Sequence, residues 1–199
     1  MSVVVVTYRT DWPERAAGLA ATLRGRLGGL AERVEHIGST SIPGMAAKDL
    51  LDMQVSVPDL DEAAVAFGGP LSELGFERRP YNHDHVPAGL DDDRERWAKR
   101  YWRRRGHGDD VNLHVRRTGS PNERLALLFR DWFRAHPGAV AGYALFKTEL
   151  SAVVPDVDAY TDIKDPVVDV VIVAAEEWAA ATGWRPWPGV TGPGCRTGA

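Results

Sequence analysis

The feature that most constrains the fold is the stretch from Val34 to Val57, which reads VEHIGSTSIPGMAAKDLLDMQVSV. It predicts a short strand, a tight turn at Gly38 and Ser39, a brief helix with Pro43 in its first turn, and a second strand over residues 50–57. The first helical turn is where the missing N–H of a proline costs least. This strand–turn–helix–strand unit forms the centre of the predicted fold.

The turn at Gly38 and Ser39 predicts a site for an anion. Backbone N–H groups and a hydroxyl near a helix N-terminus favour anions, and phosphate above all. Asp52 follows Ser39 by thirteen residues, at the start of the second strand, where a carboxylate can hold a divalent cation against that phosphate. Together these residues form the smallest set that metal-assisted nucleotidyl chemistry needs. The alternative is an ordinary turn and a solvated acid at the end of a strand.

The composition indicates a folded domain rather than a disordered or membrane chain. Hydrophobic residues make up 44% of the 199 residues and charged residues 26%, and no apolar run approaches the roughly 20 residues of a membrane span. The opening MSVVVVTY lacks a basic segment and predicts a first strand over Val3–Thr7, not a signal peptide. The sole cysteine, Cys195, excludes an intramolecular disulfide and favours a cytoplasmic location.

Helices are predicted on both sides of the central unit. Asp11 and Glu14 form a capping-box pattern for a helix that Gly28-Gly29 ends, and Ser120 and Glu123 repeat the pattern later in the chain. The other predicted elements are a helix over 61–67 that breaks at Gly68-Gly69-Pro70, a strand over 76–79, a helix over 140–153 after a break at His136-Pro137-Gly138, and a helix from Asp156 to Thr182 that is interrupted at Asp165-Pro166. Residues 183–199 are rich in Gly and Pro and predict a flexible tail.

A polar loop is predicted over residues 80–93, and it contains His83, Asp84 and His85. The H-D-H spacing is too tight for a usual zinc site, and nothing nearby in the sequence completes a tetrahedral set of ligands. We therefore expect these three side chains to be solvated.

Residues 97–104 and 111–117 predict a hairpin whose second arm alternates apolar and polar side chains. If the polar face of that arm lies beside Asp52, Asn112 and His114 line the same cleft. A histidine there can bind phosphate, ligate a metal or act as a base, although a single strand histidine is more often a surface residue. Residues 94–117 carry nine Lys and Arg against three acids, within a chain of net charge −4. This positive segment predicts either a polyanionic ligand such as a nucleotide or a solvated hairpin face.

The sequence resembles the GrpB family, which is similar to the nucleotidyltransferase superfamily. The resemblance covers roughly residues 3–182 and rests on YRTDW, on VEHIGSTSIPGMAAK with LLDMQVSV, on NLHV followed by Gly119-Ser120, on FRDWFRAHP and on YTDIKDP. It implies an α/β (α+β) fold, with a nucleotidyltransferase-like mixed sheet, flanking helices and a C-terminal helical hairpin. We expect one domain over residues 1–182, divided into a core at 1–118 and a helical part at 119–182.

The resemblance also implies the site residues. Gly38 and Ser39, with Thr40 in the same turn, would bind the phosphates, and Asp52 would hold magnesium. Gln54 stands where nucleotidyltransferases usually have a second carboxylate, and Asn112 and His114 stand where a third is usual, so the family's two-metal chemistry is in doubt here. The further candidates for binding the triphosphate are Lys48, Arg100, Arg116, Lys147 and Lys164.

The resulting hypothesis is a magnesium-dependent enzyme that moves a nucleoside monophosphate from a nucleoside triphosphate to an unknown acceptor, with Asp52 and His114 as its catalytic residues. The alternative is a catalytically silent module that binds a nucleotide or a partner, and Gln54 favours it. We expect neither membrane binding nor nucleic-acid binding, and a homodimer stays open.

Overall fold

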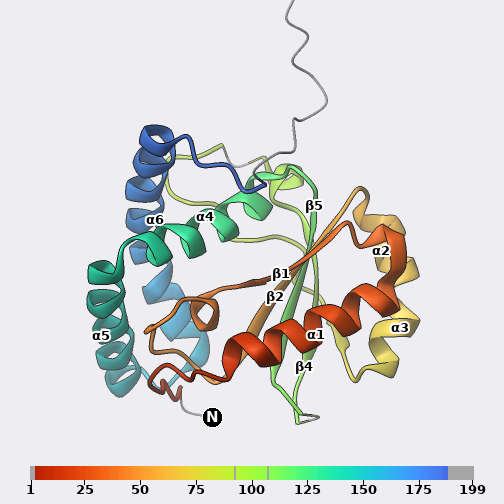
Figure 1. The fold of residues 1–199 in the computed structure, drawn as a ribbon, viewed down its shortest axis with the longest axis horizontal. Coiled ribbons are helices and arrows are strands. Elements are labelled where there is room, and N and C mark those ends of the chain that lie inside the picture. Colours follow the sequence, from red (N-terminus) through yellow and green to blue (C-terminus); the bar gives the residue numbers. More distant parts are fainter. Residues whose placement is uncertain (1–2, 92, 107, 188–199) are drawn as a thin grey trace, which may run out of the picture.

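The computed structural model describes residues 3–91, 93–106 and 108–187, and its centre is a five-stranded mixed sheet (Figure 1). The strands are Arg33–Ile37 (β1), Leu51–Val57 (β2), Glu77–Arg79 (β3), Lys99–Arg104 (β4) and Val111–Arg117 (β5). They lie in the order β1-β2-β5-β4-β3, with β2 and β5 parallel and the other neighbours antiparallel. The predicted mixed sheet and hairpin are confirmed.

The two faces of the sheet differ because apolar and polar residues alternate along its strands. Met53 and Val55 of β2 and Leu113 and Val115 of β5 are fully buried on one face. They pack against three helices in the main hydrophobic core, namely α1 (Trp12–Leu27), α2 (Leu60–Ala66) and α3 (Gly68–Glu73). The residues between them in sequence point to the opposite face, which is therefore polar.

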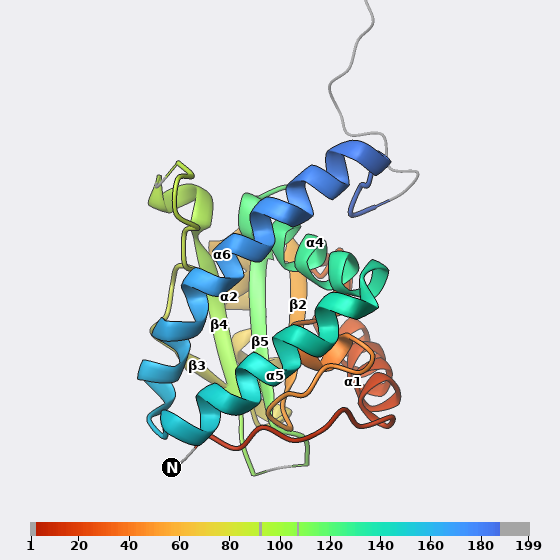
Figure 2. The ribbon, with the colours of Figure 1, turned by 90° about the vertical axis from the view of Figure 1, so that its left-hand side faces the viewer.

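Three C-terminal helices cover the polar face: α4 (Pro121–Ala135), α5 (Pro137–Val153) and α6 (Val157–Thr182). Figure 2 shows α5 and α6 crossing in front of β2 and β5. These helices hold together through their own apolar clusters, in which Leu128 of α4 packs with Ile172 of α6. The helical C-terminal part expected from the sequence is confirmed.

Helix α6 is continuous through Pro166, so the predicted interruption at Asp165-Pro166 is wrong. A proline inside a helix costs about 3 kcal/mol in lost hydrogen bonding and steric clash. Buried contacts on both sides of it, from Tyr160 in one cluster and Ile172 in another, hold the helix together.

Several local predictions need correction. Val3–Thr7 forms no strand of the sheet, because only Val6 pairs, in an isolated bridge to Ala47. A 3₁₀ helix, Ser39–Ser41, follows Gly38 directly and ends before Pro43, so Pro43 is not in its first turn. The carboxylate of Asp11 contacts arginines and makes no cap hydrogen bond.

Other predicted boundaries shift by a few residues. The expected break at Gly68-Gly69-Pro70 is the first turn of α3, and α5 begins at Pro137 instead of residue 140. Cys195 and residues 188–199 of the predicted tail lie outside the described residues. Within the described ranges, no helix has both the length and the hydrophobicity needed to cross a membrane.

Candidate functional site

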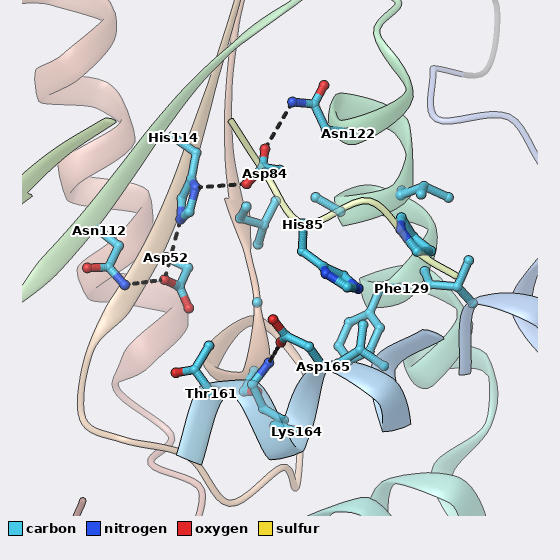
Figure 3. A pocket seen from close by; sticks show the side chains of 18 of the residues that line it. Asp52, Asp84, His85, Asn112, His114, Asn122, Phe129, Thr161, Lys164 and Asp165 are labelled. Carbon is cyan, nitrogen blue, oxygen red and sulfur yellow. Dashed lines mark hydrogen bonds and ion pairs between the residues drawn. The ribbon is translucent and has the colours of Figure 1, made fainter. Parts of the chain in front are cut away.

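A cavity of about 470 Å³ lies between the polar face of the sheet and the three C-terminal helices. Figure 3 shows side chains from the sheet, from α4, from α6 and from the loop at residues 84–87 pointing into it. The structure brings together most of the predicted site residues along its wall, namely Gly38, Ser39, Thr40, Lys48, Asp52, Asn112, His114, Arg116, Lys147 and Lys164.

Asp52 occupies the centre of this wall. Its Cα partners are Ile37 on one neighbouring strand and Asn112 on the other, and Asn112 Nδ2 donates a hydrogen bond to Asp52 Oδ1 at 2.9 Å. His114 Nε2 lies 3.8 Å from the same oxygen. A Cβ at Gly38 would stand 2.5 Å from Asp52 Oδ2, and Gly38 has a φ of +66°. Only glycine therefore allows the turn to come this close to the acid.

Burial and charge set the protonation states of Asp52 and His114. Burial acts to raise the pKa of Asp52, but His114, the Asn112 hydrogen bond and the charge of Lys48 outweigh it and hold that pKa below its ordinary value. Burial lowers the pKa of His114 to about 4, against the opposing effect of Asp52. At neutral pH the site thus contains an ionised carboxylate beside a neutral imidazole.

Ser39 and Lys147 form the second feature of the cavity. Lys147 Nζ donates a hydrogen bond to Ser39 Oγ at 2.8 Å, although the two residues are far apart in sequence. Lys147 is 3% exposed, and burial, together with the charges of Lys164 and Lys48, lowers its pKa to about 7. Lys48 from the loop before β2, Lys147 from α5 and Lys164 from α6 all line the cavity. Their converging amines would attract an anion.

Asp84 is the site residue that sequence reasoning missed. Its carboxylate accepts hydrogen bonds from Lys99 Nζ at 2.6 Å, Arg116 Nε at 2.8 Å and Asn122 Nδ2 at 2.9 Å. Burial acts to raise its pKa, but the charges of Arg116 and Lys99 hold it far below the ordinary range. The prediction of a solvated side chain is wrong for Asp84.

The neighbours of Asp84 in the loop also differ from the prediction. His85 Nε2 lies 2.9 Å from Asp169 Oδ1 of α6, so His85 connects the loop to that helix across the cavity wall.

The one sequence signal for a buried acid at Asp84 was the pair of basic residues, Lys99 and Arg116, on matched positions of the hairpin. Two cations on the polar face of a sheet need a carboxylate partner.

Two predicted residues do not reach the cavity. Arg100 alternates to the other face of β4, where its Nη2 contacts Asp61 Oδ1 at 2.5 Å beside a separate cavity of about 280 Å³. Gln54 is fully buried beneath the site, where its Oε1 accepts a hydrogen bond from Arg116 Nη1 at 2.5 Å. The strand alternation that places Asp52 correctly also places Arg100 on the wrong face for the predicted role.

The donor set fits a protein-held magnesium ion poorly. Magnesium needs several free oxygen ligands in near-octahedral geometry. The oxygen of Gln54 is taken by Arg116, and Asn112 Oδ1 accepts hydrogen bonds from Tyr101 Oη at 2.6 Å and Arg105 Nη2 at 3.0 Å. Asp52 is left as the one predicted metal ligand that faces the cavity with a free oxygen, and no group of three or more metal-binding side chains occurs among the described residues.

Comparison with known proteins relates the chain to one family. The family profile described as GrpB protein matches residues 2–173. The dephospho-CoA kinase of Mycolicibacterium paratuberculosis is 34% identical over 194 residues, which is 88% of this chain and 46% of that protein. The UPF0157 protein BH1888 of Halalkalibacterium halodurans is 30% identical over 175 residues, covering 87% of this chain and 83% of the relative.

A solved structure has the same fold. The conserved protein GrpB from Enterococcus faecalis is 27% identical, covers 88% of this chain and 99% of its own, and superposes with a TM-score of 0.71. The chain spans about half the length of the dephospho-CoA kinases that it matches.

Proposed function

The chain belongs to the GrpB family, and on this premise we propose that it is a nucleotidyltransferase-like enzyme that moves a nucleoside monophosphate from a nucleoside triphosphate to an acceptor. The observation that carries the proposal is the hydrogen bond from Lys147 to Ser39, next to the Gly38 turn that touches Asp52. This hydrogen bond places a serine and a lysine, both residue types suited to binding phosphate, in the same cavity as the ionised Asp52.

The donor nucleotide binds through its phosphates. Ser39 and the amines of Lys48, Lys147 and Lys164 surround the β- and γ-phosphates, and charge-assisted hydrogen bonds to phosphate are the strong ones. Without an anion, burial and the like charges of Lys164 and Lys48 lower the pKa of Lys147 to about 7. A bound triphosphate raises that pKa again, so the lysine is fully charged in the complex.

In the proposed reaction an oxygen or nitrogen of the acceptor attacks the α-phosphorus in line. The bond from this phosphorus to the oxygen bridging the β-phosphate breaks, and pyrophosphate leaves on the side of the lysines. The proton of the acceptor passes to His114 or to a water. His114 is neutral at pH 7 and can accept it, and Asp52 stabilises the imidazolium that forms.

A second candidate is a module that binds the nucleotide without turning it over. The engaged oxygens of Gln54 and Asn112 favour it, because they leave no second ligand for a catalytic metal. Relatives twice as long are named dephospho-CoA kinases, and this chain contains no G-x-x-x-x-G-K-[ST] sequence of its own. An accessory role beside a dephospho-CoA kinase is consistent with the names of these longer relatives and with the lack of that sequence in this chain.

Thermal unfolding with ATP, with and without magnesium, tests binding, and pyrophosphate release with hydroxyl, amine and carboxylate acceptors tests turnover. We expect ATP to stabilise the protein, and Ser39→Ala and Lys147→Met to weaken that binding about tenfold or more. Ser72→Ala, an exposed site on α3, is the matched control. Equal ATP binding by Ser39→Ala and the parent protein would falsify the proposal, whereas binding without pyrophosphate release across the panel supports the module.

A further inference from the structure

A row of polar residues continues across the sheet beyond Asp52. Asn112 is the Cα partner of Asp52, and Arg103 of β4 is in turn the partner of Asn112. Directly paired residues of neighbouring strands point to the same face, so the Arg103 side chain lies on the face of the acid. Arg105 reaches the same place, since its Nη2 donates a hydrogen bond to Asn112 Oδ1 at 3.0 Å.

The guanidinium groups of Arg103 and Arg105 share one ion-paired carboxylate among the described residues. Arg103 has no carboxylate within ion-pair distance among residues 3–91, 93–106 and 108–187, and its Nε is buried without a hydrogen-bond partner there. The nearest acid to Arg105 is Asp110, at 3.5 Å. Burial, and then the charge of Arg103, lower the pKa of Arg105, as expected for like charges held close together. An anionic ligand held between the two guanidinium groups would offset their mutual repulsion.

These arginines lie on the opposite side of Asp52 from the phosphate-binding turn. In the strand order β1-β2-β5-β4-β3, Gly38 follows β1 on one side of Asp52, and Arg103 lies in β4 on the other side. In an in-line transfer the incoming acceptor and the departing pyrophosphate occupy opposite sides of the reacting phosphorus. The arginines therefore stand on the acceptor side.

We infer that Arg103 and Arg105 bind an anionic group of the acceptor, a carboxylate or a phosphate monoester, and so orient its nucleophile toward the α-phosphorus beside Asp52. This inference rests on the proposed function. Guanidinium groups present paired N–H donors that match the planar geometry of a carboxylate and the oxygens of a phosphate. Tyr101 completes the site, with its hydroxyl on Asn112 and its ring against Tyr81 at 6.0 Å between centroids.

The test uses the full chain and two probes, phenyl phosphate and benzoate, titrated by calorimetry at low ionic strength with and without a non-hydrolysable ATP analogue. The Arg103→Gln/Arg105→Gln double variant should bind at least one probe about tenfold more weakly, while its ATP affinity stays within about twofold. Lys147→Met should weaken the binding of ATP and leave the affinity for both probes unchanged. Arg26→Gln, whose partner Glu73 is exposed on the far helices, controls for the loss of a positive charge.

The outcomes separate the proposed acceptor site from the proposed nucleotidyltransferase activity. Equal probe affinity in the parent protein and the double variant, or no binding of either probe, overturns the acceptor site. Loss of ATP binding in the double variant overturns it too, because the arginines would then serve the donor. If ATP fails to bind the parent protein while a probe binds in an arginine-dependent way, the anion site stands and the nucleotidyltransferase proposal fails. Whichever probe binds more tightly distinguishes a phosphate from a carboxylate.

Discussion

At the scale of single residues, Lys147 combines deep burial with a hydrogen bond to a serine. Among the residues that the structure describes, its ammonium donates one hydrogen bond, to Ser39, and it lies 5.1 Å from the centroid of the Tyr143 ring. Neither neighbour carries a full negative charge, which is why burial dominates its pKa. A residue in this state is unfavourable for folding and favourable for binding an anion.

The pH dependence of stability should reveal this residue. Burial lowers the pKa of Lys147 to about 7 in the folded state from its ordinary value of 10.5, so between these values the unfolded chain binds more protons than the folded one. Stability therefore rises with pH across this window, with a slope of up to about 1.4 kcal/mol per pH unit. In Lys147→Met this contribution is absent, and the variant should be the more stable protein near pH 6.

Chemical denaturation of both proteins at several pH values from about 6 to 9 measures the difference. Phosphate must be left out of the buffer, because a bound anion would raise the pKa of the lysine. Parallel stability curves for Lys147→Met and the parent protein would contradict the assigned protonation.

At the scale of elements, Asp84 attaches the loop before β4 to the sheet and to α4. Asp84→Asn leaves Lys99 and Arg116 without their carboxylate in a mostly buried place. Breaking a buried pair by removing one partner costs about 3–5 kcal/mol, and partial exposure puts this case toward the lower value. We expect Asp84→Asn to lose about 3 kcal/mol of unfolding free energy at pH 7.

The same variant has a signature in acid. The folded pKa of Asp84 lies below its unfolded value, so its stabilising effect is present above about pH 4 and is lost as the pH falls further. The difference in unfolding free energy between Asp84→Asn and the parent protein should become smaller below about pH 4. Asp61→Asn, an 88% exposed acid that pairs with Arg100, serves as the control and should change stability by less than about 1 kcal/mol.

Helix α6 offers a test of what holds a proline in its interior. Pro166 is exposed, so its replacement removes no packing. Pro166→Ala restores a helical N–H donor and should stabilise the protein by about 1–3 kcal/mol, measured by denaturant unfolding. ATP affinity should not change. A loss of affinity would mean that the proline shapes the part of α6 that carries Lys164 into the cavity.

At the scale of the whole molecule, the sheet with α1–α3 and the layer α4–α6 have separate apolar cores. Polar bonds join much of the boundary between the two layers, such as those from Arg130 to Glu35 at 2.8 Å and from Gln54 to the backbone of Glu123 at 3.3 Å, beside apolar contacts of Ile42 and Met45 with α4 and α5. The cavity of about 470 Å³ lies along the same boundary. Polar boundaries open more easily than apolar cores, so the helical layer should be the less stable unit.

Native-state hydrogen exchange can measure whether the helical layer α4–α6 is less stable than the sheet. Amides of α5 and α6 should exchange with a lower opening free energy than those of β2 and β5. ATP should slow exchange in α5 and α6 most, because Lys147 and Lys164 would join the helices to a ligand held by the Ser39 turn. Uniform protection of both layers, unaffected by ATP, would contradict this picture.

The sequence by itself determined the features that depend on local pattern. Alternating apolar residues specified β2 and β5 and placed Asp52, Asn112 and His114 on one face. The GrpB motif marked Gly38 and Ser39, and the structure explains the glycine by its contact with Asp52. The prediction of a shared face for Asp52, Asn112 and His114 is confirmed, because side-chain direction in a strand follows from position in the sequence.

Only the tertiary structure decided which distant residues meet. It brought Asp84 to Lys99 and Arg116, Lys147 to Ser39, and Gln54 to Arg116, and it kept α6 continuous through a proline. None of these follows from spacing, because each depends on how the helical layer and the loop at residue 84 lie on the sheet. The free energy of such contacts comes from burial and charge in three dimensions, which a linear pattern does not record.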